Sequence, residues 1–185
     1  DLSLVNIGGV SRFRGHYLHG LTVCRLLINL ILPISQDEED VVLSAALGHI
    51  LTNQMDFSEL EKILRQEYRM DPRICEIIYL ITNDTDLSEE GQRLFYERIR
   101  NNKLAILVFL ADRANLLEQL YNLSIWSANE YIYETRTYLF PICFHIKENN
   151  PELIPSVNIL MEKVRTMTDS CAVLFGRYEK REMEL

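Results

Sequence analysis

Apolar residues recur at helical spacing along most of the chain, and polar or proline-containing breaks divide this pattern into separate segments. No run of strand-like alternation, internal repeat or linker interrupts it. The pattern therefore predicts an all-α fold of about eight helices in a single domain spanning residues 1–185. The expected helices cover residues 17–32, 35–53, 58–68, 71–82, 88–100, 103–121, 127–145 and 151–178, the last opening at Pro151 or Pro155.

Capping residues mark several of the helix starts. A serine followed three residues later by glutamate can satisfy two free backbone N–H groups reciprocally. Asp71 before Pro72 and Ser88 after a polar loop (residues 83–87) indicate two further starts. Pro141 should kink the helix that contains it. The Ser-x-x-Glu pairs are Ser35 with Glu38, Ser58 with Glu61 and Ser127 with Glu130.

The segment over residues 103–121 is apolar nearly all round in its first half, which is typical of a helix at the centre of a domain. Asp112 lies in this segment, and a buried carboxylate is costly without a partner. Its partner can be an arginine on another helix, a metal ion or several N–H donors. The sequence leaves these alternatives open.

His19 and His49 also lie inside apolar helices. Each can be a hydrogen-bonded core residue. Together with Asp112, they can instead form a metal site of the type with two histidines and one carboxylate. His16 precedes His19 by one helical turn and can share its face. Spacing alone does not establish whether these side chains converge.

Composition narrows the classes of function. The net charge of −8 and the pI of about 5.1 argue against general nucleic-acid binding, which requires clustered cations. The four cysteines are far apart and form no CxxC pair, so we expect buried free thiols in a reducing cytoplasm and no structural zinc site. Residues 1–10 lack a secretory-signal pattern, and the most apolar stretch, residues 104–111, is too short to span a membrane.

Several segments resemble, in order and at fitting spacing, the HD-type hydrolase domain of the RelA/SpoT alarmone family. Leu110-Ala111-Asp112-Arg113 looks like that family's Leu-Ala-Asp-Arg core, and Tyr17-Leu18-His19-Gly20 resembles its Tyr-Ile-x-His-Pro segment. His49 falls where the family carries a His-Asp pair. Tyr133-Glu134-Thr135, followed by Phe140-Pro141-Ile142, resembles its Arg-Glu-Thr and Ala-Pro-Leu helix. The resemblance covers residues 12–145 and implies an HD-like bundle. Nothing indicates a synthetase domain.

In that family, a manganese ion held by two histidines and two aspartates helps to remove the 3′ pyrophosphate of guanosine tetra- or pentaphosphate. The resemblance carries three of these metal ligands onto His19, His49 and Asp112. Ile50 occupies the position of the fourth ligand and cannot bind metal. We therefore expect weakened Mn²⁺ binding, or none if the site is degenerate.

The family also uses a Glu-Asp pair, which positions the attacking water and handles its proton. The corresponding catalytic positions here are Asn53 and Gln54, which keep the shape but lose the charge and the basicity. Hydrolysis by the family's route is therefore not expected to be fast.

The resemblance also suggests contacts for a phosphorylated guanosine nucleotide. Arg12 or Arg14 can match an arginine that precedes the family's first histidine, and Arg113 and Asn115 follow Asp112. The family's nucleotide-contacting asparagine is Leu116 here. Replacing three acids by neutral residues makes the pocket more positive, even without a divalent ion, and this suits a phosphorylated ligand.

Three interpretations of function remain open. The chain can bind a nucleotide or a protein partner without turnover. It can be an active phosphohydrolase whose water is activated by Asp56 or His16. It can also be a helical interaction module with a filled pocket.

Overall fold

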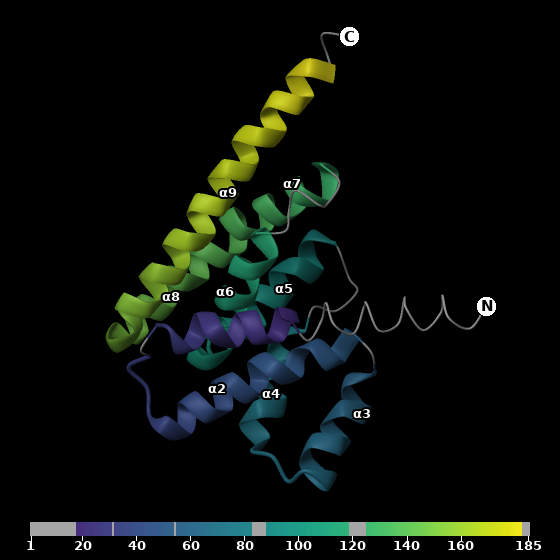
Figure 1. Cartoon of the computed structure of the whole chain (residues 1–185), viewed down its shortest axis with the longest axis vertical. Coiled ribbons are helices and arrows are strands. Elements are labelled where there is room, and N and C mark those ends of the chain that lie inside the picture. The colour runs from purple at the N-terminus through teal and green to yellow at the C-terminus, as the bar shows by residue number, and fades with distance from the viewer. Residues whose placement is uncertain (1–17, 31, 54, 83–87, 119–124, 183–185) are drawn as a thin grey trace, which may run out of the picture.

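The computed structural model describes residues 18–182 apart from residues 31, 54, 83–87 and 119–124. Every regular element within these residues is helical, and none of them forms a strand. The all-α prediction is therefore confirmed (Figure 1). The elements are a first helix over residues 18–28, α2 (Gln36–Gly48), α3 (Phe57–Lys62), α4 (Pro72–Ile81), α5 (Glu89–Ile99), α6 (Lys103–Leu117), α7 (Ile125–Glu134), α8 (Phe140–Asn149) and α9 (Ile154–Glu182).

Three helices begin where the sequence predicts, and at each start one side chain caps the helix. Ser35 and Glu38 form the expected reciprocal capping box at α2. The Asp71 side chain accepts from the backbone N–H of Arg73 at α4, and the Ser88 hydroxyl accepts from that of Gly91 at α5. Local capping therefore defines these three helix starts.

Two of the expected capping boxes are wrong. Helix α3 begins at Phe57 after Asp56, whose extended backbone takes the N-cap position, so Ser58 lies inside the helix. Helix α7 begins at Ile125, so Ser127 also lies inside its helix. A Ser-x-x-Glu pair is compatible with the interior of a helix, because the pair alone does not define the residue at which the backbone becomes helical.

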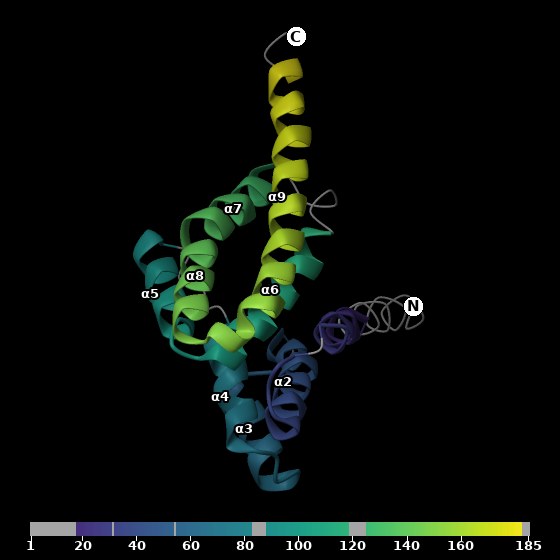
Figure 2. The same cartoon turned by 90° about the vertical axis from the view of Figure 1, so that its left-hand side faces the viewer.

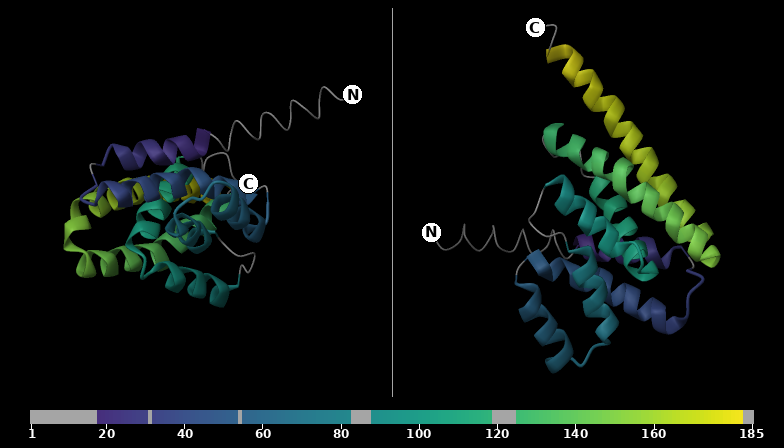
Figure 3. Two further views of the ribbon diagram at one scale, coloured as in Figure 1. Left: turned by 90° about the horizontal axis from the view of Figure 1, so that it is seen from below. Right: turned by 180° about the vertical axis from the view of Figure 1, so that it is seen from behind.

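The expected kink at Pro141 is present as a change of helix type. A π turn over Thr135–Leu139 separates α7 from α8, and Figure 2 shows the change of direction there. Proline has no N–H for the carbonyl one turn earlier, so regular α-helical bonding cannot continue through this point. At the other end of α8, a 3-10 turn over Pro151–Leu153 precedes α9. Helix α9 continues to Glu182, past the expected end at Tyr178, and extends beyond the other helices (Figure 3).

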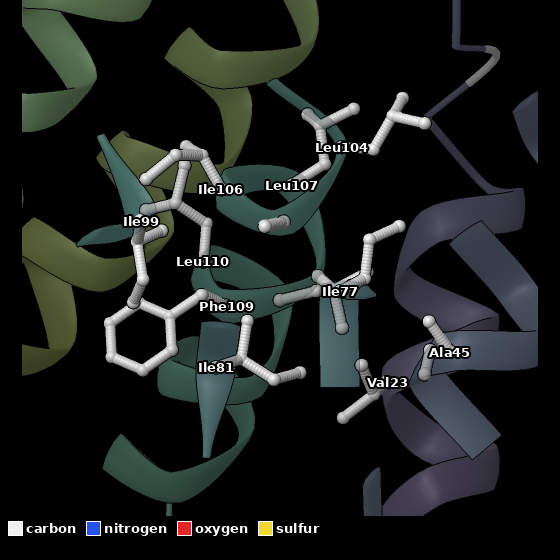
Figure 4. Packing of buried hydrophobic residues seen from close by; sticks show 14 of the residues in the cluster. Val23, Ala45, Ile77, Ile81, Ile99, Leu104, Ile106, Leu107, Phe109 and Leu110 are labelled. Carbon is white, nitrogen blue, oxygen red and sulfur yellow. The ribbon is translucent and has the colours of Figure 1, made fainter. Parts of the chain in front are cut away.

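Helix α6 lies at the centre, as its apolar sequence predicts. It contacts α2, α4 and α9, and every side chain from Leu104 to Ala111 is buried. Figure 4 shows Ile106 and Leu110 of α6 beside Ile99 of α5. Each such fully buried aliphatic side chain contributes roughly 1.5–3 kcal/mol relative to exposure. Among the helices described, none combines the length and the apolar character needed to cross a bilayer.

The four cysteines are buried free thiols, as expected. Burial raises the pKa of Cys143 to about 12 and that of Cys24 to about 11. A thiol that resists ionisation is a poor nucleophile and a poor metal ligand. Both cysteines therefore act as small apolar residues of the core.

Candidate metal centre

Three side chains from different elements converge beside α6. His19 lies on the first helix, His49 begins a 3-10 turn (His49–Asn53) after α2, and Asp112 lies on α6. The Nε2 atoms of His19 and His49 lie 2.7 and 3.4 Å from Oδ1 of Asp112. One ligand atom of each residue lies within 4.8 Å of the others. The expected convergence is therefore confirmed, and we call these three residues the histidine–aspartate cluster.

Close packing between the first helix and α2 brings the two histidines together. The two helices lie side by side (Figures 1 and 3). A Cβ added at Gly20 would lie 3.5 Å from the carbonyl oxygen of Ala46 and 3.4 Å from Ile50. On the same face of the first helix, Val23 and Leu27 follow His19 at four-residue intervals and are fully buried. This face therefore directs His19 inward, towards α6.

The environment of His49 defines which of its ring nitrogens carries hydrogen. Its Nδ1 lies 2.8 Å from the carbonyl oxygen of Ala46, and a carbonyl can only accept. Nδ1 therefore donates, and Nε2 faces Oδ1 of Asp112 at 3.4 Å, with either a proton or a lone pair between them. A lone pair and a carboxylate oxygen repel each other unless a proton or a metal ion lies between them. The geometry therefore favours a cation at this point.

Asn115 lies beside the histidine–aspartate cluster, on the next turn of α6. It is buried, and its side-chain amide nitrogen contacts Nδ1 of His19. In this arrangement the amide donates to Nδ1, and Nε2–H of His19 donates to Asp112. Reversing the amide would place its oxygen on Nδ1 and free Nε2 for a metal ion. The family resemblance predicts a nucleotide contact for Asn115 and gives no sign of this contact with His19, although the i+3 spacing of Asn115 from Asp112 indicates a shared face.

Asp112 remains ionised within this environment. Burial alone would raise its pKa, but the hydrogen bonds with His19 and His49 outweigh burial and hold the pKa well below the usual range. The side chains of the cluster keep 13–17% of their surface exposed, so solvent and small ions can reach them. Among the residues that the structure describes, the partners of Asp112 are these histidines, and no arginine forms an ion pair with it.

The neighbouring Arg113 faces a different set of helices. Its Nη2 lies 3.2 Å from a carboxylate oxygen of Glu134 and donates to the hydroxyl of Tyr96 at 3.1 Å. Its guanidinium lies over the rings of Phe109 and Tyr131, 5.3 and 4.9 Å from their centroids. This buried ion pair joins α5, α6 and α7. A nucleotide contact by Arg113 stays a prediction, and it would compete with these interactions.

Other residues of the expected site are placed only in part. Ile50 is buried beside the first helix and offers no ligand atom. Asp56 is exposed at the start of α3 and is not a member of the cluster. Asn53 ends the 3-10 turn, but its side chain lies outside the described residues. The same holds for the whole of Gln54, Arg12, Arg14 and His16.

The donor set fits a divalent ion. Two imidazole nitrogens and one carboxylate oxygen suit Mn²⁺, Fe²⁺ or Zn²⁺ and leave coordination positions for water or a phosphate oxygen. The bond from His49 to Ala46 is the kind of outer contact that orients ligating histidines. Comparison of the chain with protein-family models, with curated proteins and with solved structures gives no match.

Proposed function

We propose that this chain is a divergent HD-type domain that binds a divalent metal ion and a phosphorylated guanosine nucleotide, with little or no hydrolysis. The observation that supports this most directly is the convergence of His19, His49 and Asp112 from separate helices. These are the residues at which the sequence resembles the metal ligands of the alarmone hydrolases. The resemblance and the geometry therefore agree on the same three side chains.

Charge favours a phosphorylated ligand at this place. Asp112 is the one anion of the cluster, and the histidines are neutral when they ligate a metal. A divalent ion would therefore leave the centre with a net positive charge. Phosphate oxygens are suited to the open positions of such an ion. Arg12 and Arg14 are further candidates for the phosphate groups.

Loss of the family's acids supports binding without turnover. Activation of water requires a group that accepts its proton near neutral pH. Ile50 offers no such group, and an amide at Asn53 or Gln54 is not basic at this pH. His19, His49 and Asp112 would hold and orient an ion and its ligand, but none of them is a free base when it is coordinated.

Titration calorimetry with Mn²⁺, followed by guanosine tetraphosphate, tests the proposal. We expect one equivalent of Mn²⁺ to bind and the nucleotide to bind more tightly once the ion is present. His49→Ala should remove both effects, because it deletes one ligand. Product formation should stay far below the ordinary enzyme range of about 1–1000 per second.

Two outcomes would overturn the proposal. Turnover near one per second would make the chain an active phosphohydrolase. Absence of both Mn²⁺ and nucleotide binding would leave the cluster as a hydrogen-bonded element of the core, and the helical interaction module would then be the better interpretation.

A further inference from the structure

A cavity lies between α5, the π turn before α8, and α8 itself. Its volume is about 250 Å³, and its lining includes Tyr96, Arg100, Thr137, Tyr138 and Pro141. None of the residues that line it belongs to the histidine–aspartate cluster. Any ligand of this cavity is therefore independent of the proposed metal centre.

One wall of the cavity is aromatic and held in place. The rings of Tyr96 and Tyr138 stack with centroids 5.2 Å apart and planes inclined by 17°. Tyr96 is buried, and its hydroxyl accepts from Arg113 in the core. Because core contacts anchor this stack, a planar ligand would meet a preformed surface and little side-chain entropy would be lost on binding.

The cavity also contains a cation without a carboxylate partner. Arg93 at its rim is held by Glu90 and Glu97, each at 2.6 Å. Arg100, the C-cap of α5 two turns after Arg93, instead donates to Nδ1 of His145 at 3.1 Å, and no described carboxylate forms an ion pair with it. A guanidinium carries five N–H donors, so most of those on Arg100 remain available to an anion.

The lining of the cavity includes an irregular stretch of backbone. Thr137 and Tyr138 belong to the π turn, and Pro141 follows it within the same lining. Pro141 supplies no N–H, so the preceding turn lacks one of its α-helical donors. Turns of this type are often found at functional sites. The exposed Thr137 adds a hydroxyl that can donate or accept.

We propose that this cavity binds a small aromatic anion, a single ring that carries a phosphate or carboxylate group. The ring lies against Tyr138 and Pro141, and the anion pairs with Arg100, whose fork suits bidentate contact. A volume of about 250 Å³ lies just below the usual range for small-molecule sites. This space suits a single ring and is too small for guanosine tetraphosphate.

Phenyl phosphate is a direct probe, read from the amide chemical shifts of Thr137, Tyr138 and Ile142. We expect dissociation constants on the order of 1 mM, as for a ligand of few atoms. Inorganic phosphate lacks the ring, and benzyl alcohol lacks the charge. Each should bind about tenfold more weakly, because each loses one half of the recognition.

Variants test whether Arg100 itself binds the anion or whether any nearby positive charge has the same effect on affinity. Arg100→Ala should weaken phenyl phosphate about tenfold, the usual scale for a charge-assisted hydrogen bond, and Arg100→Lys should retain part of the affinity. Lys147→Ala is the matched control, because Lys147 is a cation on α8 that lies over the ring of Phe144 and does not line the cavity. It should leave the affinity unchanged, and so should His49→Ala, whatever the fate of the metal centre. Unchanged affinity in Arg100→Ala, or inorganic phosphate that binds as tightly as phenyl phosphate, would overturn the proposal.

Discussion

The imidazole of His49 donates from Nδ1 to the carbonyl oxygen of Ala46, 2.8 Å away and one turn earlier in the chain. This bond fixes the ring so that Nε2 faces Asp112. Histidines that bind metals commonly use their second nitrogen in this way. The Ala46 carbonyl therefore orients His49 as a ligand before any ion binds.

Acid should destabilise the protein through Asp112. The pKa of this carboxyl is lowered in the folded state, so ionised Asp112 stabilises the fold above the pKa of the unfolded chain, about 3.9. The stabilisation is lost as the pH falls below that value towards the folded pKa. Urea unfolding between pH 2.5 and pH 7 should show a loss on the order of 2 kcal/mol from this group. Asp112→Asn should lack this component of the pH dependence.

Asp56→Asn is the control for that experiment, because Asp56 is exposed and its side chain makes no capping hydrogen bond. It should follow the natural protein across the whole pH range. If Asp112→Asn did the same, Asp112 would not be held by the histidines in solution.

Asn115→Asp should tighten the binding of Mn²⁺. An aspartate accepts from Nδ1–H of His19, which leaves Nε2 of His19 free to bind the ion. Outer contacts of this kind change metal affinity by about 10–100-fold, and calorimetry measures the change. Asn101→Asp adds the same charge at an exposed position and should have little effect. Equal affinities for the two variants would mean that Asn115 does not govern His19.

The helix starts at Ser35, Asp71 and Ser88 could be predicted because a cap is a local interaction. Those at Ser58 and Ser127 could not, because the backbone becomes helical earlier in the chain at both places. Prolines also act locally, through a missing N–H. Pro151 and Pro155 flank the turn before α9, and Pro141 follows the π turn.

Prediction of the histidine–aspartate cluster required information that is not local. Spacing left open whether His19, His49 and Asp112 converge, and only the family resemblance implied that they do. The contact of Asn115 with His19 and the pairing of Arg113 with Glu134 both depend on how α6 is rotated against its neighbours. Such rotation is a property of the whole packing and is not encoded in a local pattern.

Glu134→Gln should destabilise the fold without changing the affinity for Mn²⁺. Arg113 is almost fully buried and its charge is balanced by Glu134, so removing that balance leaves a buried cation. Breaking a buried pair in this way costs about 3–5 kcal/mol. Asp169→Asn breaks the exposed pair with Arg136 and should cost at most about 1 kcal/mol. Thermal unfolding measures both, and similar losses in the two variants would contradict the structural role given to Arg113.

Putting acids back should restore function in steps. Ile50→Asp places a carboxylate next to His49 and should tighten the binding of Mn²⁺ while turnover stays low, because a base is still missing. Ile50 is buried, so the new charge should destabilise the metal-free protein by a few kcal/mol. Added Mn²⁺ should recover this stability by mass action. Ile50→Asn has a similar shape without the charge, and it should show the loss of stability without the gain in affinity.

Hydrolysis of guanosine tetraphosphate should require the triple variant Ile50→Asp, Asn53→Glu and Gln54→Asp, since water activation needs both a firmly held ion and a base. Phosphate analysis with Mn²⁺ present should detect product from the triple variant and little from any single change. Clustered carboxylates repel one another without metal, so the melting temperature of the triple variant should fall in a chelator and rise with Mn²⁺. A triple variant with the natural metal affinity and the natural metal-free melting temperature would mean that these positions do not face Asp112 together. The domain would then share the fold of a hydrolase without its pocket, and binding through its helical surface would become the better account of its function.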